Sequence, residues 1–318
     1  MQLSIIIPTH KRRDILRQCL ECIGKQTLLR SSGASKGKPF AQDIEVVVVS
    51  DGPDEKTSEM IASLSWPFEI QHFAIPKSQQ GVARNRAVEK ARGKYSLLIS
   101  DDIFLAEDAC ERHLNAHGAM EAPNPKHQAP NKHQIPSTKY AVLGFTTWDP
   151  SLKITPLMRW MEESGVQFGY PLVAPFTHTF LPETEQHFFT YASNLSLPTK
   201  ILWQHPFRED ALLYGWEDVE WGRRLAQSGV RLFYEPDARG YHHHPFTDAE
   251  VWERSRTLGQ SAAHLERALA AEGDVDLRIV PHGIKKFLYT ILSFLPTYRG
   301  KHWRAFLRGV RTLRDLSK

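Results

Sequence analysis

The sequence has few cysteines and no basic leader. Three cysteines, Cys19, Cys22 and Cys110, are too few for a disulfide framework, and a structural zinc site needs about four ligands. No positively charged segment with a long apolar stretch opens the chain, so we expect no signal peptide. The apolar stretches near the C-terminus are far shorter than the roughly 20 residues needed to span a bilayer. These absences favour a reducing, cytoplasmic location.

The composition favours one large folded domain with appendages, and its charge is unevenly distributed. The chain has 318 residues, is 41% hydrophobic and carries a formal net charge of +4. From residue 283 onward there are nine basic residues and one acid, a net charge of +8, which leaves −4 for the rest. A basic tail on an acidic body indicates contact with an anionic surface, which is either lipid or nucleic acid. The apolar pattern of the tail favours lipid, so we expect no nucleic-acid partner.

Strand-like and helix-like runs alternate through the first hundred residues. Apolar runs at 3–8, 44–49 and 95–99 predict strands, and 68–75 predicts a weaker one. Helical periodicity occupies 12–26 and 81–92. Strands without polar alternation are typical of a sheet covered on both faces. The pattern predicts an α/β fold, a doubly wound, mostly parallel sheet flanked by helices.

The second half is less regular. We predict strands at 191–197 and 230–234, and a helix at 217–228 that ends at Gly229. Residues 30–42 and 121–138 are rich in residues that break regular structure and are predicted to be inserted loops. His127 and His133 lie in the second loop, where we expect them to be solvated rather than metal ligands.

Acidic residues follow two of the predicted strands directly. Asp51 ends the second strand, and Asp101 and Asp102 follow the fourth. In a doubly wound sheet the ligand crevice lies outside the carboxyl ends of the strands, so all three should face it. Asp51 beside Gly52 is also a common turn pattern. Adjacent carboxylates repel unless a cation neutralises them, so Asp102 is predicted to bind a divalent metal.

Four segments carry a resemblance to a known family. They read SIIIPTHKR at 4–12, EVVVVSDG at 45–52, GVARNR at 81–86 and GKYSLLISDD at 93–102. In order and spacing they resemble the donor half of family-2 glycosyltransferases, which have the GT-A fold. The resemblance implies that Pro8, Thr9 and Asp51 hold the base and part of the ribose. It also implies that Arg84 lies near the nucleotide and that Asp101 contacts the ribose.

The metal motif of that family is altered here. The resemblance makes Asp102 the metal-binding end of an Asp-x-Asp motif, but the first position is Ser100. A serine hydroxyl can form hydrogen bonds and carries no charge. The division of roles between Asp101 and Asp102 therefore stays open.

A second motif supplies candidate reacting groups. Residues 214–225, YGWEDVEWGRRL, are similar to the Gly-Trp-Glu-Asp motif of this and related GT-A families. The resemblance implies that Asp218 is the catalytic base and that Glu217 binds the acceptor, with the two roles interchangeable. It also suggests that Asn194 lines the acceptor side. The alternative for Glu217 and Asp218 is that acids in a first helical turn are favoured by the helix dipole.

Three consecutive histidines follow the last predicted strand. In an extended segment His242 and His244 share one face and His243 takes the other. Related enzymes place a histidine here as a further metal ligand, for which we favour His242 and then His244. The alternative is that they are incidental surface residues. Aspartate, histidine and diphosphate oxygens together suit Mn²⁺ or Mg²⁺ better than structural zinc.

These features predict a metal-dependent transferase that acts in glycan or polysaccharide synthesis. It would transfer a sugar from a nucleoside-diphosphate sugar, most readily a UDP-sugar, to a carbohydrate or other hydroxyl acceptor. We expect inversion of the configuration at the anomeric carbon, and retention stays open. A nucleotidylyltransferase is disfavoured because residues 9–12 contain no glycine to cradle a triphosphate. A non-catalytic glycan- or membrane-binding protein is a further alternative. The predicted GT-A domain is 1–250, with a donor half at 1–118 and an acceptor half at 140–250.

The C-terminal extension, 251–318, is predicted to be helical and basic. One apolar stripe comprises Ile284, Phe287, Leu288, Ile291, Leu292 and Leu295, and a second comprises Trp303, Phe306, Leu307, Val310 and Leu313. Two interpretations stay open for 283–318. It is a peripheral anchor on anionic lipid at the inner face of a membrane, or it is a hairpin packed on the domain with its basic face in water.

Overall fold

The computed structural model describes residues 1–31, 43–121, 139–210 and 214–315. The predicted loops at 30–42 and 121–138, with His127 and His133, fall almost entirely outside the described residues. The chain divides into two compact units. The first comprises 1–153, 164–207 and 218–244, and the second comprises 154–163, 208–217 and 245–318.

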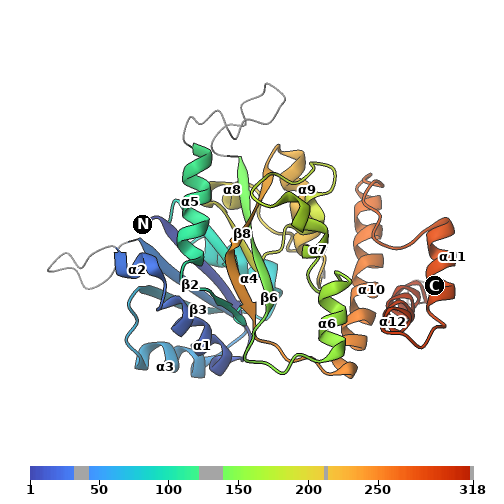
Figure 1. Ribbon diagram of the computed structural model, residues 1–318, viewed down its shortest axis with the longest axis horizontal. Helices are drawn as coiled ribbons and strands as arrows, with labels where there is room; N and C mark the ends of the chain where they lie inside the picture. The colour runs from blue at the N-terminus through green and yellow to red at the C-terminus, as the bar shows by residue number, and fades with distance from the viewer. Residues whose placement is uncertain (32–42, 122–138, 211–213, 316–318) are drawn as a thin grey trace. The chain divides into compact units, whose positions relative to one another are not determined.

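The first unit is built on one curled eight-stranded sheet (Figure 1). In spatial order its strands are β3 (Glu69–Ile75), β2 (Ile44–Asp51), β1 (Leu3–Thr9), β4 (Tyr95–Ile99), β7 (Asn194–Pro198), β6 (Tyr140–Trp148), β8 (Arg231–His242) and β5 (Ile103–Leu105). The first four are parallel. β7 is antiparallel to its neighbours β4 and β6, β6 is parallel to β8, and β5 is antiparallel to β8. The predicted α/β sheet is confirmed.

Helices cover both faces of this sheet, as the apolar strands require. Along β1, Leu3, Ile5 and Ile7 pack on one face and Ile6 on the other, because successive side chains alternate. The first face is covered by α1 (Arg13–Ile23), α3 (Glu55–Ser63) and α5 (Ala109–Glu121). The opposite face is covered by α4 (Gln80–Val88), α8 (Thr199–Gln204) and α9 (Glu217–Gln227). The short helices α2 (Thr27–Ser31) and α7 (Tyr170–Val173) complete the unit.

The second unit is helical. It contains α6 (Pro156–Glu163), α10 (Asp248–Ala271), α11 (Gly283–Leu292) and α12 (Tyr298–Asp315). Glycines let α10 and α12 approach closely: a Cβ at Gly259 would lie 2.0 Å from the Phe306 carbonyl oxygen, and one at Gly309 would lie 1.9 Å from that of Arg256. Among the described helices, none combines the length and apolarity needed to cross a bilayer.

Candidate active site

Four strands bring polar side chains to one edge of the sheet. β1, β2 and β4 run in the same direction. Because β7 is antiparallel to both β4 and β6, and β6 is parallel to β8, β8 also runs in that direction. Thr9, Asp51 and His242 end β1, β2 and β8, and Asp101 closely follows β4. The predicted crevice edge therefore carries residues from both halves of the sequence.

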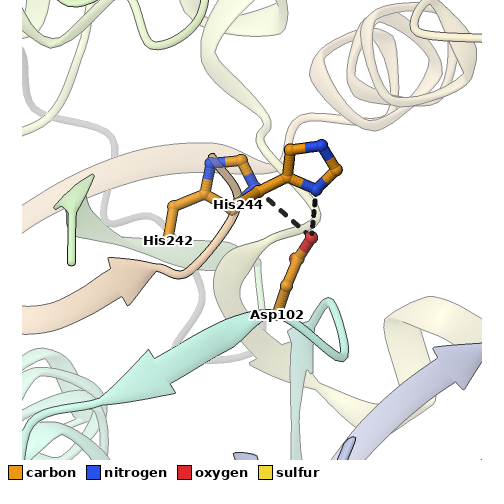
Figure 2. Close-up of side chains that lie close together, drawn as sticks. All are labelled: Asp102, His242 and His244. Carbon is orange, nitrogen blue, oxygen red and sulfur yellow. Dashed lines mark ion pairs between the residues drawn. The ribbon is translucent and has the colours of Figure 1, made fainter. Parts of the chain in front are cut away.

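A buried carboxylate and two histidines lie together at this edge (Figure 2). Asp102 Oδ2 is 3.4 Å from His242 Nε2 and 3.5 Å from His244 Nδ1. Asp102 and His242 are buried, and His244 is partly exposed. One ligand atom from each residue lies within 4.8 Å of the other two. An oxygen and two imidazole nitrogens form a donor set that fits Mn²⁺.

Strand pairing brings these distant residues together. β5 and β8 are antiparallel with Ile103 opposite His242, and the His243 N–H donates to the Asp102 carbonyl at 2.8 Å. The backbone thereby fixes Asp102, which precedes β5, beside the end of β8. Nothing in the local sequence of either segment specifies this pairing.

The middle histidine faces away from the cluster. His243 Nδ1 is 2.7 Å from Asp149 Oδ2, and its ring stacks on Phe104 with centroids 4.8 Å apart. The His242 and His244 rings stack on each other at 5.7 Å. The predicted alternation of the three histidines is confirmed.

Arg12 joins the two aspartates. Its two terminal nitrogens lie 2.9 Å from Asp101 Oδ1 and 2.9 Å from Asp102 Oδ2. The guanidinium therefore balances part of the charge of the pair. The sequence places Arg12 in the segment 4–12 that carries the family resemblance and at the start of a helical run, and neither pattern predicts its contact with the two aspartates. The available signal was a cation just after β1, whose carboxyl end meets the acids.

The two aspartates have different electrostatic environments. Burial, and then the neighbouring Asp102, raise the pKa of Asp101 to about 6, although Arg12 and a 2.7 Å hydrogen bond from Thr9 Oγ1 oppose this. Burial also disfavours the charge of Asp102, but His242, His244 and Arg12 outweigh it and hold the pKa well below its usual range. Asp102 therefore carries the firmer negative charge.

Asp51 is tied to the loop that follows β3. Its carboxylate pairs with Lys77 and accepts hydrogen bonds from the Ser78 N–H at 2.6 Å and the Ser78 hydroxyl at 3.1 Å. Burial would raise the pKa of Asp51, but these partners lower it. Asp51 thus anchors the loop after β3, and its contact with a nucleotide stays a prediction.

A cavity adjoins this edge. It has a volume of about 640 Å³, within the usual range for small-molecule sites. It lies where the chain leaves β1 and β2. Its lining residues are Lys11, Arg12, Arg13, Asp14, Ile15, Pro53, Asp54, Glu55 and Lys56. Arg12 thus links the cavity to both aspartates.

Two other predicted nucleotide-site residues lie in the interior. Pro8 is buried in β1 beside Thr9. Arg84 is 3% exposed on α4, donates to the Ala192 carbonyl at 3.2 Å and lies over the Phe207 ring. Arg84 therefore supports the packing of α4, and its proximity to a nucleotide stays a prediction.

The predicted reacting acids open α9. Glu217 is its first residue, and Glu217 and Asp218 are both partly buried. The Asp218 carbonyl accepts a hydrogen bond from Thr190 Oγ1 at 2.8 Å. Glu220, further along the helix, is buried and paired with Arg224 at 2.7 Å, which is a structural role.

A partly buried tyrosine, Tyr191, lies within electrostatic range of Asp218. Burial raises the pKa of Tyr191, and the negative charge of Asp218 adds to this rise. The Gly169 N–H donates a hydrogen bond to the Tyr191 hydroxyl at 2.9 Å, which lowers the pKa. Phe168, next to Gly169, packs edge-on against the His242 ring with centroids 5.5 Å apart. Residues 168 and 169 thus contact His242 and Tyr191, respectively.

Asn194 is a core residue, which corrects its predicted place on the acceptor side. Its side chain is fully buried, donates to the Phe145 and Ala238 carbonyls at 3.1 and 2.8 Å, and pairs with His113 Nε2 at 3.0 Å. The β6–β8 register shifts between Gly144 and Phe145. Asn194 satisfies carbonyls that this irregularity frees.

Residues 4–134 match the sequence model of a family described as Glycosyl transferase family 2. The matched region includes Thr9, Asp51, Asp101 and Asp102, and it ends before Asp218 and the three histidines. The match supports the resemblance based on the four N-terminal segments. The Gly-Trp-Glu-Asp segment lies outside it.

Individual proteins extend the comparison. Validoxylamine A glucosyltransferase of Streptomyces hygroscopicus subsp. jinggangensis is 23% identical over 256 residues, 75% of this chain and 54% of that protein. The mannosyltransferase PcManGT from Pyrobaculum calidifontis, in complex with GDP-Man and Mn²⁺, has a TM-score of 0.60 and 15% identity over 100% of this chain and 88% of that one. S. aureus TarS 1-349 in complex with UDP has a TM-score of 0.52 and 14% identity, covering 99% and 92%.

These similarities establish the fold as GT-A, with a curled central sheet flanked by helices. The chain spans about half or less of the length of the curated relatives it matches.

Proposed function

We propose that this protein transfers a sugar from a nucleoside-diphosphate sugar to a hydroxyl of a carbohydrate or other acceptor, in the synthesis of a glycan or polysaccharide. The observation that carries the proposal is the group of buried Asp102, buried His242 and partly exposed His244 at the carboxyl edge of a GT-A sheet. A group able to hold a divalent cation suits departure of a diphosphate, because the cation would offset the negative charge that develops on it. The family match and the sugar-transferring relatives support this reaction class.

The donor side comprises the ends of β1, β2 and β4. Thr9 and Asp101 are hydrogen-bonded to each other, and we assign Asp101 to the ribose. Pro8, Thr9 and Asp51 are assigned to the base and the rest of the ribose. TarS binds UDP and the mannosyltransferase binds GDP-Man, so a nucleoside diphosphate is the shared chemistry and a UDP-sugar is the first donor to test.

Asp102, His242 and His244 would hold the divalent cation, Mn²⁺ or Mg²⁺. The mixed oxygen and nitrogen donors favour Mn²⁺, and the mannosyltransferase neighbour contains Mn²⁺. When bound, the cation supplies charge that stabilises the departing diphosphate. Arg12 holds Asp101 and Asp102 in place and places a second positive group beside the same carboxylates.

Asp218 would take the proton from the acceptor hydroxyl. A hydroxyl is a weak nucleophile until a positioned base removes its proton in the transition state. One base suffices for direct displacement, which inverts the anomeric carbon without a covalent intermediate. Glu217 would bind the acceptor, or the two acids would exchange these roles. The resemblance of residues 214–225 to the Gly-Trp-Glu-Asp motif supports the choice of Asp218.

Nucleotide-dependent stabilisation tests the donor proposal. Thermal unfolding would be followed with UDP, GDP, ADP and CDP, each with and without Mn²⁺. A ligand at 100 times its dissociation constant stabilises the fold by about 2.7 kcal/mol, so binding is readily detected. We expect one nucleoside diphosphate with Mn²⁺ to raise Tm more than either component alone. No shift with any of them would contradict the proposal.

The stereochemistry is tested separately once a donor is known. The anomeric configuration of the first-formed product, followed by NMR, is expected to be opposite to that of the donor. A product with the donor's configuration would contradict inversion but would remain consistent with sugar transfer.

A further inference from the structure

The surface of the second unit carries a concentrated apolar stripe. Of thirteen large hydrophobic residues exposed in the described part of the chain, six lie between residues 284 and 295. They are 45% to 78% exposed. They are Ile284, Phe287, Leu288, Ile291, Phe294 and Leu295, here named the α11 stripe. At 3.6 residues per turn the helical members share one face of α11, and no residue of α11 is buried.

The other face of α11 is the one that packs on the protein. Tyr289 stacks on Trp303 of α12 with ring centroids 3.8 Å apart and planes 8° apart. Arg304 Nε donates to the Ser293 carbonyl at 2.8 Å. These contacts fix the orientation of α11, so the α11 stripe faces away from α12.

The second predicted stripe behaves differently. Phe306, Leu307 and Val310 of α12 are buried, and Phe306 and Val310 pack with Leu258 and Ala262 of α10. The side chain of Leu313 lies outside the described residues. The two open interpretations of the tail therefore apply to different helices: α12 packs on the protein, whereas α11 leaves its apolar stripe exposed.

The charge around the α11 stripe is of one sign. No acid occurs between Asp276 and Asp315. Lys285, Lys286 and Arg299 are exposed, and Lys285 lies about 100° around the helix from Ile284, at the margin of the stripe. An apolar stripe with a basic margin complements an anionic bilayer interface, where hydrocarbon lies beneath negative headgroups. A second copy of the same face would instead bring the lysines together without acids to pair them.

We propose that the α11 stripe docks this protein on the surface of an anionic membrane, with its apolar side chains in the interface, Lys285 at the headgroups, and Lys286 on the side of α11 away from the stripe, where it adds positive charge near the surface. α11 has 10 residues and a length of about 15 Å, half of the hydrocarbon thickness, so it lies in the interface rather than across it. This inference is independent of the proposed sugar transfer.

Vesicle co-sedimentation of the full chain tests it. The vesicles would be phosphatidylcholine alone, or equal parts of phosphatidylcholine and phosphatidylglycerol. Phe287→Ser combined with Phe294→Ser is expected to weaken binding to the mixed vesicles by at least about tenfold. Val275→Ser is the matched control, since Val275 is 61% exposed in the same unit outside the stripe. It should bind like the unaltered chain. Equal binding by the double variant would overturn the proposal.

Charge and self-association provide two further arms. Lys285→Glu combined with Lys286→Glu is expected to weaken binding to the anionic vesicles by about tenfold or more, with little change on phosphatidylcholine alone. Unchanged binding to both would overturn the anionic preference. Sedimentation velocity without lipid is expected to give the same oligomeric state for all variants. A dimer that the serine variant dissociates would overturn the lipid assignment in favour of a second copy.

Discussion

Two pairs of histidines pack against the same sheet, and only one of them faces a carboxylate. His242 and His244 at the end of β8 approach Asp102 at 3.4 and 3.5 Å. His113 and His117, one turn apart on α5, face uncharged Ser196: its hydroxyl lies 2.9 Å from His113 Nδ1 and 2.9 Å from His117 Nε2. Two histidine pairs on one sheet therefore have different chemical capacities.

The difference comes from the partners. Full burial lowers the pKa of His113 to about 4, and it lowers that of His117 as well, so both stay neutral and hold α5 on β7. Asp102 gives the first pair a fixed negative charge, which a divalent cation requires. Of these two pairs, only the one beside a buried carboxylate therefore has the charge that favours a divalent cation.

Asp102→Asn should have the largest effect, because it removes the charge that distinguishes the two pairs. Sugar transfer should fall by about a thousandfold or more, since the cation stabilises the leaving group by several kcal/mol. Steady-state kinetics with the identified donor would measure this. Asp237→Asn, the same change in the more exposed group of His178, Glu235 and Asp237, is the control and should leave kcat within about twofold of the unaltered protein. Equal losses in both variants would remove the distinction.

Asp218→Asn separates proton transfer from cation binding. Transfer should fall by about a hundredfold to ten-thousandfold, the usual contribution of a general base. Stabilisation by UDP with Mn²⁺ should persist, because Asp218 lies outside the group of Asp102, His242 and His244. Comparison of kcat with the Tm shift would measure both. Full activity would exclude Asp218 as the base, and Glu217→Gln would then be the variant to examine.

The neutral pair should make the fold sensitive to acid. The unfolded chain binds protons on His113 near its ordinary pKa of about 6.5, whereas the folded chain does so only near 4. Between these values the unfolded state carries more protons, so the free energy of unfolding should fall as pH decreases, by up to about 3 kcal/mol from His113. His117 acts in the same direction. Urea unfolding from about pH 7 to about pH 4.5 would measure the slope.

His113→Gln is the matching variant for this slope. It should reduce the pH dependence while the affinity for Mn²⁺ stays unchanged. A slope as steep as that of the unaltered chain would show that acid acts through other groups.

Within the first pair, His242→Gln should weaken Mn²⁺ binding more than His244→Gln does. His242 is buried beneath Trp148, with ring centroids 5.3 Å apart, whereas His244 is partly exposed and water can replace it. We expect the affinity for Mn²⁺ to fall by about a hundredfold in His242→Gln and by about tenfold in His244→Gln. Calorimetric titration with Mn²⁺ and UDP would rank them, and the reverse order would assign the principal ligand to His244.

Local patterns predicted much of the sheet and part of the candidate site. The strand at 95–99 is found at those residues, and the strand at 44–49 extends to Asp51. Fully apolar runs specify buried parallel strands, and parallel strands place their terminal acids at one edge. Period-two geometry predicted which histidines face together. These features depend on residues close in sequence.

Features that depend on distant pairing could not be predicted. The β5–β8 ladder brings Asp102 beside His242, although no local pattern joins the two segments. The salt bridges of Arg12 and the burial of Asn194 also arise from contacts across the sheet. α11 and α12 have similar apolar stripes, and only the packing of α12 on α10 determines which stripe is buried.

Mn²⁺ binding is the most direct test of the central claim that Asp102, with His242 and His244, holds the catalytic cation. Electron paramagnetic resonance would follow free Mn²⁺ during titration of the protein in the presence of UDP. The account predicts tight binding by the unaltered chain and by His113→Gln, and a loss of about a hundredfold or more in Asp102→Asn. Equal affinity in Asp102→Asn and the unaltered chain would contradict it.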